Sequence, residues 1–405
     1  MEIRKITQAE RVHFDAINYE CFVGMRGTDI RERLNSPPEA PTEDDDDDSR
    51  SPVWAAFENG KMLSGMVVNN YTIRMNGHNV QMGGIGGVVT KPEARGKGYV
   101  RRIMRPVFDE MRATGQVYSF LYPFSYPYYR TFGYEMCYPR QYVTVDMNQL
   151  SKFPYPNDIT PHEPNDPIEP YMQIYNAFIT NRNMAVVRGE SAWKRMLKRD
   201  PYLKREFTFL NRDANGTPNA YVLYGVSKSN DTNYLNIREL CWTEPAGLHA
   251  MLGFFGKLSA EFRGIQWNVP DGLNLQAILP DPYSVTWANK AIVMNRIVDV
   301  PAVLAMQPAP IGNGILTIGV TDAFVPENTG LYRIEWESGR LSVTQNAESF
   351  ASADMETNVT ALAQLTTGYI TAAEVRYRND TVVRDKAEEL ALLFPKKDLY
   401  MLEGF

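Results

Sequence analysis

Cysteine and histidine are scarce in this sequence. The 405 residues include three cysteines (Cys21, Cys137 and Cys241) and four histidines, with no CxxC pair and no HExxH run. Disulfide frameworks and metal knuckles need cysteines at short, repeated spacings, and zinc hydrolases need the paired helical histidines. The composition therefore argues against a disulfide-stapled fold, and we expect no metal site.

Long apolar runs and a surplus of positive charge are also missing. No apolar stretch reaches the roughly 18 residues that cross a membrane, and the opening MEIRKITQAERVHF lacks the apolar core of a signal peptide. The six acids from Glu43 to Asp48 account for the formal charge of −6, since the chain has 48 Asp and Glu against 42 Lys and Arg. We expect a cytoplasmic protein with no membrane span that binds no nucleic acid, because nucleic-acid proteins carry a basic surface.

Length and proline content predict three domains. At roughly 100–200 residues per domain, this chain holds two to four. Six prolines in FPYPNDITPHEPNDPIEP, residues 153–170, predict a connecting segment. We place the domains at 1–150, 151–285 and 286–405. The run from Ser36 to Pro52, with four prolines beside the acids, is expected to be a mobile loop.

Apolar periodicity predicts an α+β (mixed α/β) fold. In the first domain we expect strands at 2–6, 53–58, 62–74, 80–90, 117–122 and 134–147, with Asn-Gly hairpin turns at Asn59 and Asn76 and an amphipathic helix after Gly98. The second domain repeats this pattern with a helical region at 171–199, strands at 206–210, 221–227, 234–242 and 265–269, and a helix at 247–262. The third has strands at 292–298, 314–321, 330–336 and 341–344 and helices at 355–366 and 380–393.

The segment GGIGGVVTKPEARGKGYVRRIM, residues 83–104, carries the clearest chemical signal. A strand runs into a glycine-containing turn, and an amphipathic helix opens directly afterwards. Unpaired amides of such a turn, with the positive end of the helix dipole, favour an anion such as pyrophosphate. Arg95 and Lys97 add charge, and Gly96 and Gly98 allow close approach of the backbone. The alternative is a tight turn with solvated cations. GxGxxG and GxxxxGK[ST] are both absent.

The arrangement resembles the GCN5-related N-acetyltransferases (GNAT superfamily), whose acetyl-CoA loop reads Gln/Arg-x-x-Gly-x-Gly/Ala. Glu93-Ala94-Arg95-Gly96-Lys97-Gly98 fits it except at the first position. Tyr129-Arg130-Thr131-Phe132-Gly133-Tyr134 is similar to the Tyr-x-x-Phe-Gly-Tyr signature of the Eis-type subgroup. The resemblance implies two tandem GNAT-like domains with mixed central sheets, the second degenerate, and a sterol-carrier-like domain whose C-terminal tail enters the first active site.

The resemblance also assigns roles to residues. Acetyl-CoA would bind through Val88, Val89, Arg95, Gly96, Lys97, Gly98, Tyr99 and Val100, with the Val88 amide polarising the thioester. Tyr129 would be the general acid, although a place in the aromatic core is its ordinary alternative. The carboxylate of Phe405 would act as base or orient the amine, whereas most chain ends fray. Glu403, and more weakly Glu20, would contact the amine.

These residues imply an acetyl-CoA-dependent N-acetyltransferase that needs no metal. The acceptor would be a primary amine that attacks the thioester directly: an aminoglycoside, a polyamine or a lysine side chain. The resemblance further implies a homo-oligomer, a hexamer or a trimer. The alternative is a non-catalytic protein that binds acetyl-CoA, or an apolar ligand through the sterol-carrier-like domain.

Overall fold

Two β-sheets organise the chain. The computed structural model describes all residues except 23–33, 35–50, 156–157, 199–200, 230 and 348, so most of the predicted acidic loop lies outside the described residues. The larger sheet has 12 strands in the order β1-β2-β3-β4-β5-β12-β6-β11-β10-β9-β8-β7, and the smaller has the order β15-β14-β13-β16-β17. With helices on both sheets, the predicted α+β class is confirmed. In the described part, every helix is too short or too polar to cross a membrane.

The first unit forms one half of the large sheet. Its strands are β1 (Glu2–Lys5), β2 (Val53–Glu58), β3 (Lys61–Met75), β4 (His78–Thr90), β5 (Gln116–Leu121) and β6 (Glu135–Asp146), and its helices are α1 (Arg11–Cys21), α3 (Tyr99–Ala113), α4 (Tyr126–Arg130) and α5 (Met147–Leu150). Asn59, Gly60, Asn76 and Gly77 all have positive φ, which confirms the two predicted hairpin turns. The apolar face of α3 is buried against the sheet, as its periodicity predicts.

The second unit forms the other half of the large sheet. Its strands are β7 (Ile159–Pro161), β8 (Glu206–Arg212), β9 (Pro218–Ser229), β10 (Thr232–Trp242) and β11 (Gly264–Val269), and its helices are α6 (Glu169–Ile179), α7 (Glu190–Leu197), α8 (Pro201–Lys204) and α9 (Pro245–Gly256). The predicted helical region 171–199 is interrupted between α6 and α7. There the chain bridges Ile73 through Val186 and Leu399 through Asn183, so tertiary pairing overrides helix propensity.

The third unit contains the small sheet. The strands of the small sheet are β13 (Asn313–Thr321), β14 (Gly330–Glu337), β15 (Arg340–Asn346), β16 (Met355–Asn358) and β17 (Val382–Val383). Before them comes β12 (Thr286–Ile297), which lies in the large sheet, and the helices are α10 (Val300–Ala305), α11 (Val359–Thr367), α12 (Ala372–Val375) and α13 (Ala387–Leu393). The helix predicted from Met355 starts four residues late, because β16 pairs with β13 and Asn358 caps α11. The helix predicted from Asp380 starts at Ala387, because β17 pairs with β16.

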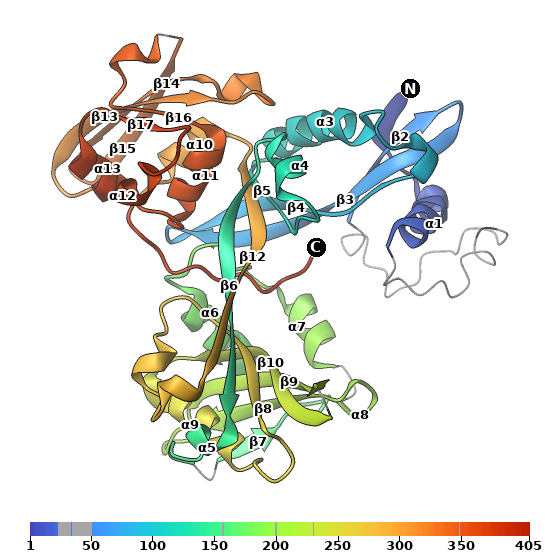
Figure 1. Ribbon diagram of the computed structural model, residues 1–405, viewed down its shortest axis with the longest axis vertical. Helices are drawn as coiled ribbons and strands as arrows, with labels where there is room; N and C mark the ends of the chain where they lie inside the picture. The colour runs from blue at the N-terminus through green and yellow to red at the C-terminus, as the bar shows by residue number, and fades with distance from the viewer. Residues whose placement is uncertain (23–33, 35–50, 156–157, 199–200, 230, 348) are drawn as a thin grey trace.

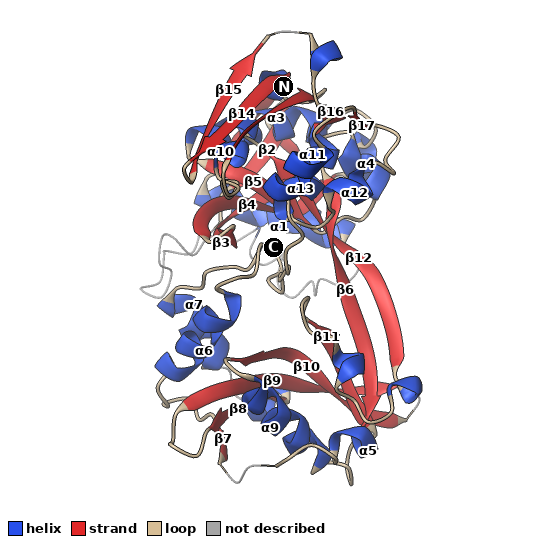
Figure 2. Ribbon diagram, turned by 90° about the vertical axis from the view of Figure 1, so that its left-hand side faces the viewer, coloured by secondary structure: helices blue, strands red, loops and turns tan. Residues whose placement is uncertain are grey.

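Strands β6 and β12 connect the two halves of the large sheet. They run side by side from the upper to the lower half of the molecule (Figures 1 and 2). β12 pairs with β5 from Ile297↔Tyr118 to Met294↔Leu121, and β6 pairs with β11 in the lower half. β12 therefore belongs to the large sheet, although the predicted range 286–405 places it with the third domain.

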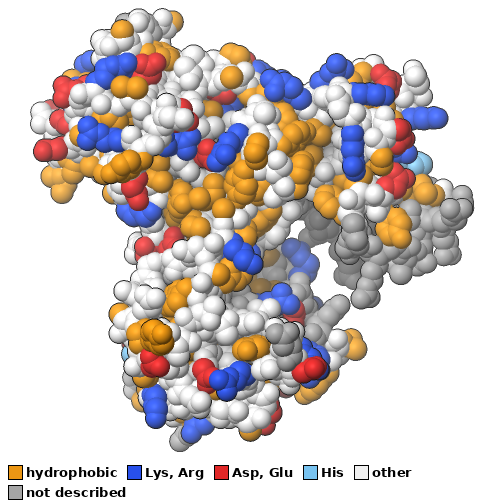
Figure 3. All heavy atoms as spheres, in the orientation of Figure 1, with side chains coloured by type: hydrophobic (Ala, Val, Ile, Leu, Met, Phe, Trp, Pro, Cys, Tyr) orange, Lys and Arg blue, Asp and Glu red, His pale blue; other side chains and the backbone are white. Residues whose placement is uncertain are grey.

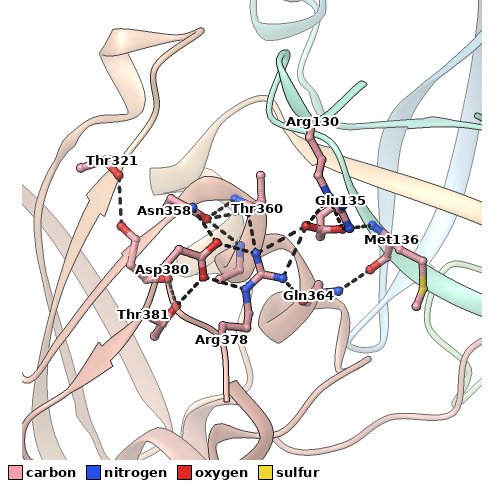
Figure 4. Close-up of polar contacts among 12 residues, drawn as sticks. Arg130, Glu135, Met136, Thr321, Asn358, Thr360, Gln364, Arg378, Asp380 and Thr381 are labelled. Atoms are coloured by element: carbon pink, nitrogen blue, oxygen red, sulfur yellow. Dashed lines mark hydrogen bonds and ion pairs between the residues drawn. The ribbon is translucent and has the colours of Figure 1, made fainter. Parts of the chain in front are cut away.

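The third unit packs against the first through a shared core and a polar network. One hydrophobic cluster contains Met82 and Tyr118 of the large sheet together with Ile318 and Leu362 of the third unit. Hydrophobic side chains gather at the centre of the face in Figure 3, where the units meet. Buried Glu135 accepts from Arg130 of its own unit and lies 3.4 Å from Arg378 of the third (Figure 4). The third unit is thereby held rigidly beside the first.

Candidate active site

The strands β4 and β5 separate at the centre of the first unit. They pair in parallel as far as Ile85↔Leu121, where β5 ends, while β4 continues to Thr90. On that side, the backbone of β4 beyond Ile85 has no paired strand in the described sheet. An extended ligand can therefore hydrogen-bond to the free edge of β4 as an added strand would.

A β-bulge lies on the same stretch of β4. Gly65 of β3 faces Val89 and Val67 faces Gly86, so Gly87 and Val88 of β4 together lie opposite the single residue Met66 of β3. Gly87 has a φ of 53°, in the left-handed region. Bulges redirect backbone groups beside functional sites. Val88 is half-buried at this bulge and has no partner in the register between β3 and β4.

The loop after β4 ends in an anion-binding geometry. Gly96 and Gly98 have φ values of 76° and 78°, and Gly98 is the N-cap of α3. No atom lies within 4 Å of a Cβ built on either glycine, so the loop backbone is open to a ligand. The first amides of the 15-residue helix and its dipole add a favourable field for phosphate.

A cavity of about 840 Å³ joins the bulge to this loop. Its walls contain seven of the eight predicted cofactor residues: Val88, Val89, Arg95, Gly96, Gly98, Tyr99 and Val100. The eighth, Lys97, is exposed and is not part of the cavity wall. The side chains of Tyr99 and Val100 are buried, so what these residues can offer a ligand is their backbone. The sequence analysis missed Phe124, Tyr128 and Phe132, which form the apolar wall.

Tyr129 lies behind this wall in an aromatic cluster. It is 2% exposed, and its ring centroid is 5.3 Å from those of Phe124 and Tyr128 and 6.1 Å from that of Tyr134. Burial raises the pKa of the Tyr129 phenol, with smaller contributions from Tyr134 and Tyr128. The group is therefore a neutral O–H donor at physiological pH.

Phe405 lies on the opposite face of β4. A Cβ built on Gly84 would stand 2.8 Å from Cγ of Phe405, and one built on Gly86 would collide with the main-chain carbonyl carbon of Phe405. The intervening Ile85 belongs to the cluster that contains Tyr129, on the α3 side. Because successive residues of a strand face opposite ways, Tyr129 and Phe405 lie on opposite faces of the sheet at the strand separation.

The tail is fixed by hydrogen bonds and ring contacts. The hydroxyl of Tyr71 donates to the carbonyl of Gly404 at 3.1 Å, and the hydroxyl of Tyr122 donates to the carbonyl of Glu403. The rings of Tyr122 and Tyr71 lie 4.9 and 5.8 Å from that of Phe405. Figures 1 and 2 show the C-terminus at the centre of the molecule, between its upper and lower halves. The aromatic anchors are too far away in sequence to be found by pattern.

Glu403 and Glu20 differ in their surroundings. One oxygen of Glu403 accepts from Nε of Arg188 at 2.6 Å, and Arg188 also pairs with Glu239. Burial alone would lower the pKa of Arg188, but these two carboxylates raise it well above its usual value. The other oxygen of Glu403 is buried with no hydrogen-bond partner among the described residues. Glu20 is exposed on α1 and contributes to neither the 840 Å³ cavity nor the tail contacts.

The glycines of β4 are a sequence signal for the tail site that did not enter the predictions. Glycine is depleted in strand interiors, and where it occurs another chain or a ligand often approaches closely. β4 contains four glycines in the run Gly83-Gly84-Ile85-Gly86-Gly87. Gly84 and Gly86 provide the space that Phe405 fills.

Comparison with known families and structures supports the same organisation. Residues 2–137 and 184–297 each match a model of an acetyltransferase (GNAT) domain, and residues 300–402 match the sterol carrier protein domain. Among curated proteins, no sequence match is found. The first and third units therefore have the predicted family assignments, and the middle unit is a second GNAT domain.

Solved structures are similar to this chain over its full length. A conserved protein from Enterococcus faecalis described as a probable N-acyltransferase has a TM-score of 0.83 at 20% identity, covering 100% of this chain and 99% of its own. A GCN5-related N-acetyltransferase from Anabaena variabilis has 0.83 at 18%, covering 100% of both chains. Eis1 from Mycobacterium abscessus has 0.78 at 17%, again covering 100% of both. With its two GNAT domains and its sterol carrier protein domain in the Eis-type order, this chain is an acetyltransferase of the GNAT superfamily.

Proposed function

We propose that the protein transfers the acetyl group of acetyl-CoA to a primary amine in the first unit. The observation that carries this proposal is the separation of β4 from β5 beside the bulge at Gly87 and Val88, joined by one cavity to the Gly96–Gly98 loop. This combination offers a free strand edge, a bulge and an anion cradle along a single cavity. An acyl thioester with an attached diphosphate matches all three features.

The residues of the cavity suit the parts of acetyl-CoA. The amides from Gly96 to Val100, with the exposed Arg95 nearby, would hold the pyrophosphate. The free edge of β4 would bind the amides of the pantetheine. The Val88 N–H would donate to the thioester oxygen, whose negative charge grows as the amine attacks.

Proton transfer completes the proposed reaction. A neutral amine nitrogen forms a bond to the carbonyl carbon, the C–S bond breaks, and the thiolate receives the proton of the Tyr129 hydroxyl. The amine loses a proton in the same sequence, either to the terminal carboxylate of Phe405 or to a water that it orients. The Tyr129 phenolate takes a proton back from solvent before the next turnover. Tyr129 and Phe405 lie on opposite faces of β4, which suits their two roles. The leaving thiol would be on the Tyr129 side of the strand and the acceptor amine on the Phe405 side.

Thiol release tests the proposal directly. Purified protein is given acetyl-CoA and a panel of primary amines that includes an aminoglycoside, a polyamine, amino acids and lysine peptides. We expect thiol release that depends on one or more amines, and an acetylated product by mass spectrometry. Binding of acetyl-CoA without transfer to any amine would instead favour a non-catalytic binding protein.

A further inference from the structure

A second, larger cavity lies beside the docked tail. It has a volume of about 1080 Å³ and is lined by both GNAT domains. Its wall contains Tyr71, which donates to the carbonyl of Gly404, and Glu403, which belongs to the tail itself. The cavity therefore adjoins the face of β4 on which Phe405 lies, which is the acceptor side in the proposed reaction.

The wall of this cavity is rich in positive charge. It contains five basic and two acidic side chains: Arg140, Arg188, Arg195, Arg238 and Lys290, with Glu239 and Glu403. Both acids bind to the same base, Arg188, and Tyr221 also donates to Glu239. The two carboxylates are thus already engaged inside the wall. Arg238 pairs with Glu206 at 3.2 Å, so Arg140, Arg195 and Lys290 are the cations that would repel a polycationic acceptor in this cavity.

Two of the bases face each other across neighbouring strands. Arg140 of β6 is the direct partner of Lys290 of β12 in the strand register. Like charges in directly opposed positions are destabilising. Neither side chain has a carboxylate partner among the described residues. Arg140 donates only to uncharged oxygens, the hydroxyl of Tyr122 at 3.0 Å and the carbonyl of Met401 at 3.2 Å, and its buried Nε has no partner there.

An unsatisfied amide lies on the same wall. Asn268 of β11 is paired with Tyr142, two residues after Arg140 on the same face of β6. Both polar atoms of the Asn268 side chain are buried and have no hydrogen-bond partner within the described structure. A buried amide without partners costs roughly 1–3 kcal/mol, and because Asn268 lines the cavity, a ligand there could supply the missing partners.

We propose that Arg140, Lys290 and Asn268 bind an oxyanion of the acceptor, so that the substrate is an amine that also carries a carboxylate or a phosphate. The inference rests on the proposed function and narrows its acceptor class. An oxyanion accepts hydrogen bonds from all three groups and relieves the repulsion between the two cations. Amino acids and peptides meet this requirement, whereas polyamines and aminoglycosides do not.

Matched pairs of amines test the inference. Lysine and cadaverine, and tyrosine and tyramine, differ only by a carboxylate, while phosphoethanolamine and ethanolamine differ by a phosphate. In each pair that turns over, we expect the anionic member to have the higher kcat/KM. Lys290→Gln should raise KM for the anionic member about tenfold, because one charge-assisted hydrogen bond is lost. KM for the member that lacks the anion should stay within twofold of the wild-type value. Lys290 is exposed, so this variant should fold normally.

Controls separate this inference from the proposed function. Lys228→Gln removes an exposed lysine outside the cavity and should change neither KM. Equal or higher kcat/KM for cadaverine and tyramine in the wild type would overturn the inference while leaving acetyl transfer intact. If no amine releases thiol, the proposed function fails, and titration with N-acetyltyrosine still decides the anion site. Weaker binding of N-acetyltyrosine by Lys290→Gln supports the site, and unchanged or absent binding overturns it.

Discussion

Tyr129 and Phe405 lie on opposite faces of β4, and each has a proton-transfer role in the proposed reaction. The hydroxyl of Tyr129 sits in an apolar cluster that raises its pKa, so it remains protonated across the neutral and mildly alkaline range. The activity should therefore show no alkaline loss from ionisation of this tyrosine.

Removing the Tyr129 hydroxyl should affect turnover and spare binding. We expect Tyr129→Phe to lower kcat by about tenfold or more, while KM for acetyl-CoA changes less than twofold, since the lost proton donor acts only on the leaving group. Tyr332→Phe is the control, because it removes the hydroxyl of another buried tyrosine, which donates to the carbonyl of Asn328 in the third unit. Equal rates for wild type and Tyr129→Phe would return Tyr129 to a packing role.

The docking of Phe405 depends on the missing side chain of Gly86. Gly86→Ala should displace the tail, because its Cβ would overlap the main chain of Phe405, and kcat should fall about tenfold if the terminal carboxylate serves the amine. Gly404→Ala changes the tail itself but meets no atom within 4 Å, so its kcat should stay close to that of the wild type. Steady-state kinetics on both variants provide the test. If Gly86→Ala is fully active, Phe405 has no part in the reaction.

A carboxylate near the start of the tail links stability to pH. Asp271 accepts a hydrogen bond from the amide of Leu399 at 3.3 Å, and burial raises its pKa to about 6 from an ordinary value of 3.8. The folded state thus binds this proton more tightly than the unfolded state. The free energy of unfolding should fall as pH rises from about 4 to 6, and then stay level.

Asp271→Asn should remove that dependence. The amide oxygen can still accept from Leu399 but carries no charge to desolvate, so the variant should be more stable than the wild type at pH above about 6. Denaturant midpoints at a mildly acidic and a mildly alkaline pH measure the effect. A difference between wild type and variant that is the same at both pH values would exclude Asp271 as the titrating group.

At the scale of elements, the loop between β4 and α3 should determine cofactor affinity. Gly96 has a positive φ, a conformation that costs a residue with a side chain about 1 kcal/mol. The methyl group introduced by Gly96→Ala would also stand in the proposed phosphate cradle. We expect Gly96→Ala to weaken CoA binding about tenfold in a calorimetric titration. Gly216→Ala is a matched control, because Gly216 has a similar φ and open surroundings in the turn between β8 and β9. Equal loss of affinity in both variants would attribute the effect to general destabilisation.

This loop is also the element that local sequence predicts best. Its glycines, its cations and the apolar face of α3 all lie within one short stretch, and the structure places nearly all of the predicted cofactor residues on one cavity wall. The interruption between α6 and α7 was not predicted, because it depends on pairing with Ile73 and Leu399, which are distant in sequence. Strand β16 was assigned to a helix for the same reason.

At the scale of the whole molecule, all three units contribute to the proposed site. The first supplies the strand separation, the second completes the wall of the larger cavity, and the third delivers the tail. The cavity wall draws on β6, β11 and β12, and Lys290 of β12 reaches Arg140 of β6 because β12 inserts between β5 and β6. No local sequence pattern reveals that Arg140 faces Lys290. A binding site for the acceptor on this wall could therefore be proposed only from the structure.

The contact between Glu135 and Arg378 joins the first and third units, and it should contribute to the stability of the protein. Glu135→Ala would leave the partly buried Arg378 and the exposed Arg130 without their shared, buried carboxylate, which we expect to cost about 3 kcal/mol of stability. Thermal unfolding should shift downward by several degrees. Glu337→Ala changes an exposed acid of the same third unit and should leave the transition in place. A transition unchanged by Glu135→Ala would show that the shared apolar core alone holds the units together.

Calorimetric titration of the intact protein with CoA tests the central claim most directly. The account predicts saturable binding with one CoA per chain, weakened in Gly96→Ala and retained in Tyr129→Phe. No detectable binding at millimolar CoA by a folded sample would contradict it.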